Sequence, residues 1–245
     1  MGRTNPDQLG RSALDAGGGA AIFPVPSPQS PVPSPQSPVP LPSLALFGGS
    51  FNPPHVGHLA LAEACAEAAG LGRVLWAPAA TPPHKRGHAD LAPAADRLAL
   101  VRAAVAGNPR FEAWGGEVER GGTSYTVDTL RALAARHAGA ELALVLGGDS
   151  LAGFASWREP REIVRLARLV VYDRPGADLA DVPAWVAGRV TRVEGPLIDL
   201  SATELRARLR AGRTVRYLVP DAVRAEIAAR GLYAAPPDRP APEGA

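Results

Sequence analysis

Residues 46–58 read LFGGSFNPPHVGH, and this stretch decides how the rest of the chain is interpreted. An apolar run ends in Gly48 and Gly49, a short proline-containing loop follows, and His55 and His58 enter an alanine-rich segment. Glycine lets the backbone approach a ligand closely, and the first turn of a helix offers free N–H groups and a positive dipole end to an anion. Imidazoles at positions i and i+3 lie on the same side of a helix. The stretch therefore predicts a phosphate-binding turn with two extra donors, which is typical of a nucleotide-handling enzyme.

The composition narrows the class of protein. The 245 residues are 46% hydrophobic and carry a formal net charge of +2, so nothing in the overall charge favours nucleic acid as a partner. Cys65 is the single cysteine, which leaves no disulfide or cysteine-based metal site and agrees with a reducing cytosol. No apolar span approaches the roughly 20 residues that a membrane crossing needs. We expect a cytoplasmic protein that neither crosses a membrane nor binds nucleic acid, and a homo-oligomer is compatible with the sequence.

The N-terminal segment differs in kind from the rest of the chain. The heptapeptide PVPSPQS occupies residues 24–30, recurs unchanged at 31–37, and begins a third time at 38. Such proline density removes backbone donors and favours extended polyproline II, with too little apolar surface to offset the entropy of ordering. We expect residues 1–42 to be a disordered, low-complexity tail, 43–234 one domain, and 235–245 a second disordered tail. A ligand for a proline-recognising domain and a translation start further downstream are alternative interpretations of the first tail.

From residue 44 onward, short apolar runs alternate with helical patterns. This βα alternation predicts an α/β fold with one doubly wound parallel sheet, helices on both faces and helices at the C-terminus. Ligands bind such sheets at the carboxyl ends of the strands, where the Gly48–His58 loop and the sequence Gly147-Gly148-Asp149 both lie. The expected strands are 44–47, 73–77, 111–114, 142–146, 169–172 and 190–193, and the expected helices 58–69, 94–106, 125–137, 159–166, 202–211 and 220–230.

A second candidate phosphate site opens one of the C-terminal helices, where residues 200–206 read LSATELR. Ser201 and Glu204 have the spacing of a capping box, which fixes a helix start. Ser201, Thr203 and Arg206 all project from the first turn, so two hydroxyls, free amides and a guanidinium can converge on a phosphate. We expect the two helix starts to bind one triphosphate from opposite sides.

Both segments resemble signatures of the nucleotidyltransferase superfamily related to class I aminoacyl-tRNA synthetases. His55-Val56-Gly57-His58 is similar to its His-x-Gly-His motif, and residues 200–206 to its Ile-Ser-x-Thr-x-x-Arg motif, with Leu200 in place of Ile. Further segments, at 82–85 (PPHK), 124–126 (SYT), 147–150 (GGDS) and 154–157 (FASW), resemble bacterial nicotinate-nucleotide adenylyltransferases over about 44–233. The resemblance implies a Rossmann-like fold and Mg²⁺-dependent transfer of AMP from ATP to nicotinate mononucleotide, giving deamido-NAD and pyrophosphate in NAD biosynthesis.

The resemblance also assigns expected roles to individual residues. Mg²⁺ would be held mainly by phosphates rather than by a protein cage, so we expect no metal ligands on the chain. The expected catalytic residues are His55, His58 and Arg206; the expected ATP-binding residues are Gly48, Gly49, Ser50, Phe51, Gly57, Lys85, Ser201 and Thr203; and the expected mononucleotide-binding residues are Tyr125, Thr126, Asp149, Trp157 and Arg158.

Two positions depart from the family pattern, and several residues have simpler interpretations. Asn52 stands where many relatives carry Asp, and Arg158 follows Trp157 where many carry Tyr. Arg158 could favour the acid over the amide through its charge or could simply face solvent. Trp157 could be packing, and Lys85 could be merely solvated.

Other functions remain open from the sequence alone. Within the enzyme class, the acceptor could be nicotinamide mononucleotide, or another phosphorylated group as in pantetheine-phosphate or cytidylyl transfer. The chain could instead be a nucleotide-sensing scaffold without catalysis, or an interaction protein whose proline-rich tail is the working part.

Overall fold

The structure is a computed structural model that describes residues 43–83, 87, 90–173, 184–195 and 198–234. Both expected tails and Lys85 lie outside these described residues.

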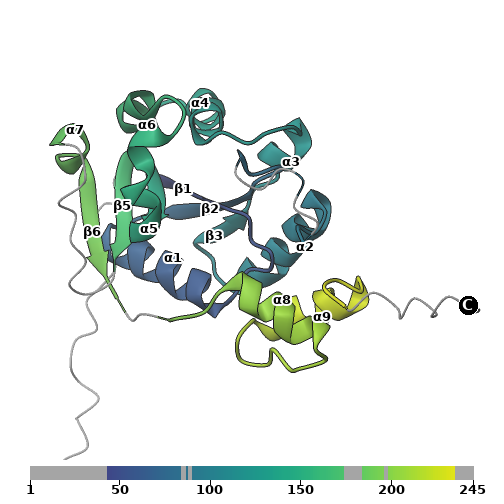
Figure 1. Cartoon of the computed structure of the whole chain (residues 1–245). Coiled ribbons are helices and arrows are strands. Elements are labelled where there is room, and N and C mark those ends of the chain that lie inside the picture. Colours follow the sequence, from purple (N-terminus) through teal and green to yellow (C-terminus); the bar gives the residue numbers. More distant parts are fainter. Residues whose placement is uncertain (1–42, 84–86, 88–89, 174–183, 196–197, 235–245) are drawn as a thin grey trace, which may run out of the picture. The chain divides into compact units, whose positions relative to one another are not determined.

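A single parallel sheet forms the centre of the domain (Figure 1). Its spatial order is β3-β2-β1-β4-β5-β6, and every neighbouring pair runs parallel. The chain therefore builds outward from β1 to β3, returns to the middle, and builds outward on the other side from β4 to β6. The strands are β1 (Leu44–Gly49), β2 (Arg73–Pro78), β3 (Phe111–Ala113), β4 (Leu142–Gly147), β5 (Arg168–Asp173) and β6 (Val190–Glu194).

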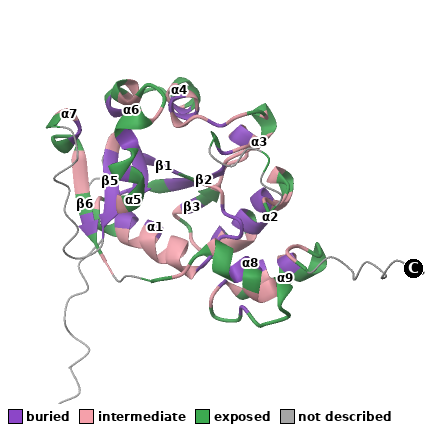
Figure 2. Cartoon of the chain, viewed as in Figure 1, coloured by how far each residue is buried: buried purple, intermediate pink, exposed green. Residues whose placement is uncertain are grey.

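The central strands are apolar runs because both of their faces are covered. Side chains alternate between faces: in β1, Leu44 and Leu46 pack into one core, whereas Ala45 and Phe47 pack into the other. Strand β4 repeats this alternation in the same register beside β1. Figure 2 shows the buried residues gathered in the sheet and on the inner sides of the helices. The sequence thus specifies a two-sided core.

Helices cover both faces, which confirms the doubly wound arrangement. On one face lie α1 (Val56–Ala68) and α2 (Ala94–Val105); on the other lie α4 (Thr126–Arg136), α5 (Gly148–Ala152), η2 (Phe154–Ser156), α6 (Pro160–Leu166) and α7 (Ala184–Ala187). Helices α8 (Ala202–Arg210) and α9 (Asp221–Ala229) form a third small core against α2. A short helix, α3 (Gly116–Arg120), precedes α4.

All the expected strands and helices are present, with ends that differ by one or two residues. The short helices α3, α5, η2 and α7 were not expected, because three to five residues carry no usable helical periodicity. Within the described ranges, no helix has the length and apolarity needed to cross a membrane.

The order of the strands places the site. Connections leave β1 and β4, two neighbouring strands, toward opposite sides of the sheet. In open α/β sheets the crevice at such a switch point, beyond the carboxyl ends of the strands, is where ligands bind. The Gly48–His58 loop leaves β1 there, and Gly148-Asp149 leaves β4 beside it.

Candidate active site

The loop between β1 and α1 buries the ring of its aromatic residue, Phe51, in the core. Phe51 has a φ of 45° and is 2% exposed, with its ring against Phe47, Trp76 and His58. A Cβ on Gly49 would lie 3.0 Å from the Phe51 ring, so a larger residue at position 49 would crowd this ring. Because the Phe51 side chain belongs to the core, any contact of this residue with a nucleotide has to come from its backbone.

The two histidines meet at the first turn of α1, as the sequence predicts. His55 is the N-cap residue, its backbone N–H donates to Nδ1 of His58 at 3.2 Å, and the ring centroids are 3.7 Å apart. Since Nδ1 of His58 accepts this bond, a neutral His58 carries its proton on Nε2. Burial lowers the pKa of His55 from 6.5 to about 4, so its imidazole is neutral at pH 7.

Gly57 lies close against the His55 side chain. A Cβ at position 57 would lie 3.1 Å from Nδ1 and 3.2 Å from Cε1 of His55. That Nδ1 atom is buried and lacks a hydrogen-bond partner among the described residues. The glycine between the histidines therefore makes room for an imidazole with an unused polar atom.

The second motif reaches the first one through Arg206. Ser201 caps α8 by accepting a hydrogen bond from the Glu204 N–H at 3.1 Å, which confirms this half of the expected capping box. Arg206 is 8% exposed; its guanidinium donates to the carbonyl of Asn52 at 2.9 Å and to Oγ1 of Thr203 at 3.3 Å. The start of α8 is thus attached directly to the loop between β1 and α1.

Asn52 organises this loop, a role that the sequence did not reveal. Its Nδ2 donates to the Asp90 carbonyl at 2.8 Å, while Oδ1 accepts from the Ala92 N–H at 3.1 Å and from the Tyr233 hydroxyl at 2.8 Å. A carboxylate could not donate to the Asp90 carbonyl, so Asn rather than Asp fits the position. The departure from the family pattern has a structural reason in this chain.

A buried arginine holds the same loop from the other side. Arg97 on α2 is fully buried and donates to the backbone carbonyls of Ser50, Ala80 and Ala92, each at 2.9 Å. Burial lowers the pKa of this guanidinium, and the charge of nearby Glu117 opposes that effect. No sequence signal marks Arg97, because an arginine on a helix is usually solvated.

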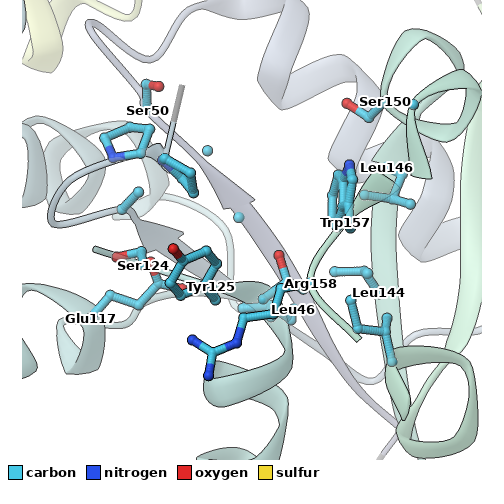
Figure 3. Close-up of a pocket in the computed structure, with 18 of the residues that line it drawn as sticks. Leu46, Ser50, Glu117, Ser124, Tyr125, Leu144, Leu146, Ser150, Trp157 and Arg158 are labelled. Atoms are coloured by element: carbon cyan, nitrogen blue, oxygen red, sulfur yellow. The ribbon is translucent and has the colours of Figure 1, made fainter. Parts of the chain in front are cut away.

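A pocket of about 600 Å³ opens at the switch point between β1 and β4 (Figure 3). The figure shows Trp157 and Tyr125 on facing sides of it, with Ser50 and Ser150 toward one end. Eight of the expected site residues line the pocket. They are Gly48, Gly49, Ser50, Tyr125, Thr126, Asp149, Trp157 and Arg158.

The remaining described site residues form a second group beside the pocket. His55, Gly57, His58, Thr203 and Arg206 gather around the starts of α1 and α8 and do not line the pocket. The loop that begins with Gly48 and ends at His55 belongs to both groups. The structure therefore places the two groups side by side and joins them through one loop, with Ser201 exposed at its edge.

Glu117 and Ser124 line the pocket, although the sequence assigned neither of them a role in the site. Glu117 is 5% exposed and accepts a hydrogen bond from Thr129 Oγ1 at 2.7 Å. Ser124 accepts one from the Ala80 N–H at 2.9 Å and so ties the pocket wall to the loop after β2. Glu117 lies on the short helix α3, which has only five residues and therefore shows no helical periodicity in the sequence.

Trp157 contacts both the core and the pocket, so its packing does not exclude a contact with a ligand. It packs on Phe154, with ring centroids 5.3 Å apart, and also lines the pocket. Cys65 is buried in α1, and burial raises the pKa of its thiol to about 12, so it is no nucleophile. Among the residues that the structure describes, no group of three His, Cys, Asp or Glu side chains could hold a metal ion.

Comparison with known proteins gives a consistent result. The cytidylyltransferase-like family profile matches residues 46–208. A probable nicotinate-nucleotide adenylyltransferase of Salinibacter ruber is 49% identical over 191 residues, covering 78% of this chain and 97% of that protein. A relative of the same name from Herpetosiphon aurantiacus is 44% identical over 198 residues, covering 78% of this chain and 98% of its own.

A solved structure agrees on the fold. The nicotinic acid mononucleotide adenylyltransferase of Plasmodium falciparum, complexed with NaAD, has a TM-score of 0.64 to this chain at 16% identity. The match covers 78% of this chain and 97% of that one, and at such identity it speaks for the fold alone. Given the match to the profile and the identity to curated relatives over nearly their whole length, the chain belongs to the nicotinate-nucleotide adenylyltransferase family, within the cytidylyltransferase-like nucleotidyltransferases.

Proposed function

We propose that the chain transfers AMP from ATP to nicotinate mononucleotide and releases deamido-NAD and pyrophosphate, a step of NAD biosynthesis. One observation carries the proposal: an aromatic-walled pocket and a pair of basic helix starts share a single loop at the switch point of the sheet. Membership in the family supports the choice of substrates.

The reaction is an in-line displacement at the α-phosphorus of ATP. An oxygen of the mononucleotide phosphate forms the new bond, the bond to the β-phosphate oxygen breaks, and pyrophosphate leaves with the electron pair. A phosphate monoester is already an anion at pH 7, so the reaction needs no general base. Catalysis then consists of positioning the reactants and stabilising negative charge.

The helix starts supply the groups for ATP. The N–H at Nε2 of His58 and the backbone around Gly48 and Gly49 would donate to phosphate oxygens, with His55 beside them. Arg206 and Thr203 would contact the β- and γ-phosphates from α8, with Ser201 at the edge of this group. We also keep Lys85 as an ATP-binding residue, although it lies outside the described residues.

The pocket would hold the mononucleotide. Trp157 and Tyr125 offer aromatic faces for the pyridine ring, since stacked rings gain about 0.5–1.5 kcal/mol beyond burial alone. Asp149, exposed in the first turn of α5, is available to a ribose hydroxyl, and Thr126 begins α4 across the pocket.

ATP would enter as its magnesium complex. Mg²⁺ retains water and binds through substrate phosphates in many nucleotide enzymes, and the described part of the chain offers no cluster of ligands of its own. We place the reaction in the cytoplasm, where ATP is supplied.

Pyrophosphate release tests the proposal. Purified protein is mixed with ATP, Mg²⁺ and either nicotinate or nicotinamide mononucleotide, and the dinucleotide product is identified by mass. We expect deamido-NAD from the acid as the faster product. If no pyrophosphate is released with either mononucleotide, the proposal is wrong. If release with nicotinamide mononucleotide is as fast as with nicotinate mononucleotide, or faster, the substrate assignment is wrong.

A variant pair links the activity to the site. His58→Ala removes one transition-state donor, and the expected loss of turnover is about 10²–10³-fold with little change in the unfolding midpoint. His137→Ala is the control, because His137 lies at the far end of α4. Near-normal turnover of His58→Ala would remove the donor role.

A further inference from the structure

We infer that Arg158 is a specificity-determining residue, whose positive charge makes the pocket prefer a pyridine carboxylate to the neutral carboxamide. The inference rests on the proposed function and goes beyond it, because it assigns the discrimination to one side chain.

The charges around the pocket single out this residue. Among the described residues that line it, Arg158 is the only cationic side chain, and the acids are Glu117 and Asp149. Glu117 is bonded to Thr129, and Asp149 stands at the start of α5. Among the described lining residues, an anionic ring substituent therefore has one cationic partner.

The guanidinium is held in place by the aromatic wall. Its Cζ lies 4.7 Å from the centroid of the Tyr125 ring, within the range of a cation–π contact. The cation is therefore fixed against Tyr125, one of the two aromatic side chains on facing sides of the pocket that could stack on a pyridine ring.

The pocket has a phosphate end and a ring end. Figure 3 shows Ser50 at one end and Arg158 toward the opposite end, with Tyr125 and Trp157 on facing sides. The reacting phosphate has to meet the loop after β1, where Ser50 lies, so the pyridine ring extends toward Arg158. A cation at that end acts on the ring substituent rather than on the phosphate.

The charge of Arg158 is only partly compensated by its protein neighbours. Its nitrogens lie 3.7 Å from Asp128 Oδ2 and 3.7 Å from Glu159 Oε1, too far for good hydrogen bonds. Glu159 is bonded instead by Arg131, at 2.5 and 3.3 Å. The guanidinium therefore keeps donors for a ligand carboxylate.

The size of the effect follows from exposure. The Arg158 side chain is 51% exposed, so solvent screens it and the full strength of a buried ion pair is not reached. A charge-assisted contact of this kind, discounted for solvent, gives roughly tenfold discrimination.

The test compares two arginines in the same kind of contact. Arg161 also stacks on an aromatic ring, with Cζ 4.7 Å from the Trp185 centroid, but it does not line the pocket. We measure kcat/KM with nicotinate and with nicotinamide mononucleotide for wild type, Arg158→Gln, Arg158→Lys and Arg161→Gln.

In Arg158→Gln we expect the acid-to-amide ratio of kcat/KM to fall about tenfold, mainly through a higher KM for the acid. Arg161→Gln should keep the wild-type ratio, and Arg158→Lys should lie between wild type and Arg158→Gln because it retains charge without the planar fork.

The outcomes separate this inference from the function on which it rests. An active wild type whose Arg158→Gln variant keeps its ratio, or loses both substrates equally, overturns the role of Arg158 alone. A wild type that releases no pyrophosphate with either mononucleotide overturns the proposed function. Raising the salt concentration should reduce the wild-type ratio but leave the Arg158→Gln ratio unchanged, and a salt-independent wild-type ratio also counts against the charge.

Discussion

At the scale of single residues, the site contains polar groups that the fold does not fully satisfy. Nδ1 of His55 and Nε of Arg206 are buried without hydrogen-bond partners among the described residues. An unsatisfied buried polar atom costs about 1–3 kcal/mol, so both atoms are expensive for stability alone. That they belong to the two helix starts expected to hold phosphate favours a role in binding.

The burial of His55 predicts how stability depends on pH. Its pKa in the folded chain, about 4, lies below its ordinary value of 6.5, so the unfolded chain takes up the proton first as the pH falls. The stability due to the neutral imidazole is complete above pH 6.5 and is lost as the pH falls toward 4, by about 3 kcal/mol. Urea unfolding of wild type and His55→Asn at pH 7 and pH 4 measures it.

The comparison cancels the carboxylates that titrate in the same range. We expect the free energy of unfolding of wild type to fall more than that of His55→Asn. If the free energy of unfolding fell equally in wild type and His55→Asn, His55 would be protonated to the same extent in the folded and the unfolded chain.

At the scale of elements, the loops after β1 and β2 are held together by side chains rather than by pairing. Arg97 joins the loop after β1 and the loop after β2 to the start of α2. The N–H of Val56, the first residue of α1, donates to the Leu218 carbonyl at 3.1 Å, which docks the segment before α9 onto the site. The geometry of the first loop thus depends on α2 and on the segment before α9, which are far apart in the sequence.

Arg97→Met tests this clamp. The change keeps an apolar stem but leaves the carbonyls of Ser50, Ala80 and Ala92 without their donor, so we expect a loss of about 3–5 kcal/mol in the free energy of unfolding. Arg102→Met, at an exposed position on the same helix, is the control and should change stability by less than about 0.5 kcal/mol. Denaturant unfolding measures both, and a small effect at Arg97 would show that water can replace its donors.

At the scale of the whole molecule, the sequence predicts the architecture better than the contacts. Alternating apolar runs such as residues 142–146 identify strands that are buried on both faces, because period and length together leave few alternatives. The motifs at His55 and Arg206 could also be found, since each marks a helix start. Arg97, Asn52 and Glu117 could not be found, because their roles arise from backbone groups brought together by the fold. The side chains of Arg97 and Glu117 look like those of ordinary surface residues until their burial is known.

The domain that carries the site should not need the N-terminal segment. The family profile matches residues 46–208, and Ser43, just before β1, is 8% exposed. Its Oγ donates to the Gly70 carbonyl and accepts from the Gly72 N–H, both at 2.9 Å. We therefore predict that deleting residues 2–42, which leaves Ser43 in place, changes kcat and KM by less than about twofold. The unfolding midpoint should change by less than about 2 °C.

Ser43, at the boundary of the deletion, provides a second variant with which to test the shortened chain. In the shortened chain, Ser43→Ala removes two hydrogen bonds and should cost about 1–2 kcal/mol, because the Gly70 carbonyl and the Gly72 N–H lose their partner. If deleting 2–42 lowered activity while leaving the unfolding midpoint unchanged, the proline-rich segment would have to act on the site. If the shortened enzyme keeps its rate, catalysis belongs to the βα domain. Any role of the proline-rich segment would then involve a partner that takes no part in the reaction.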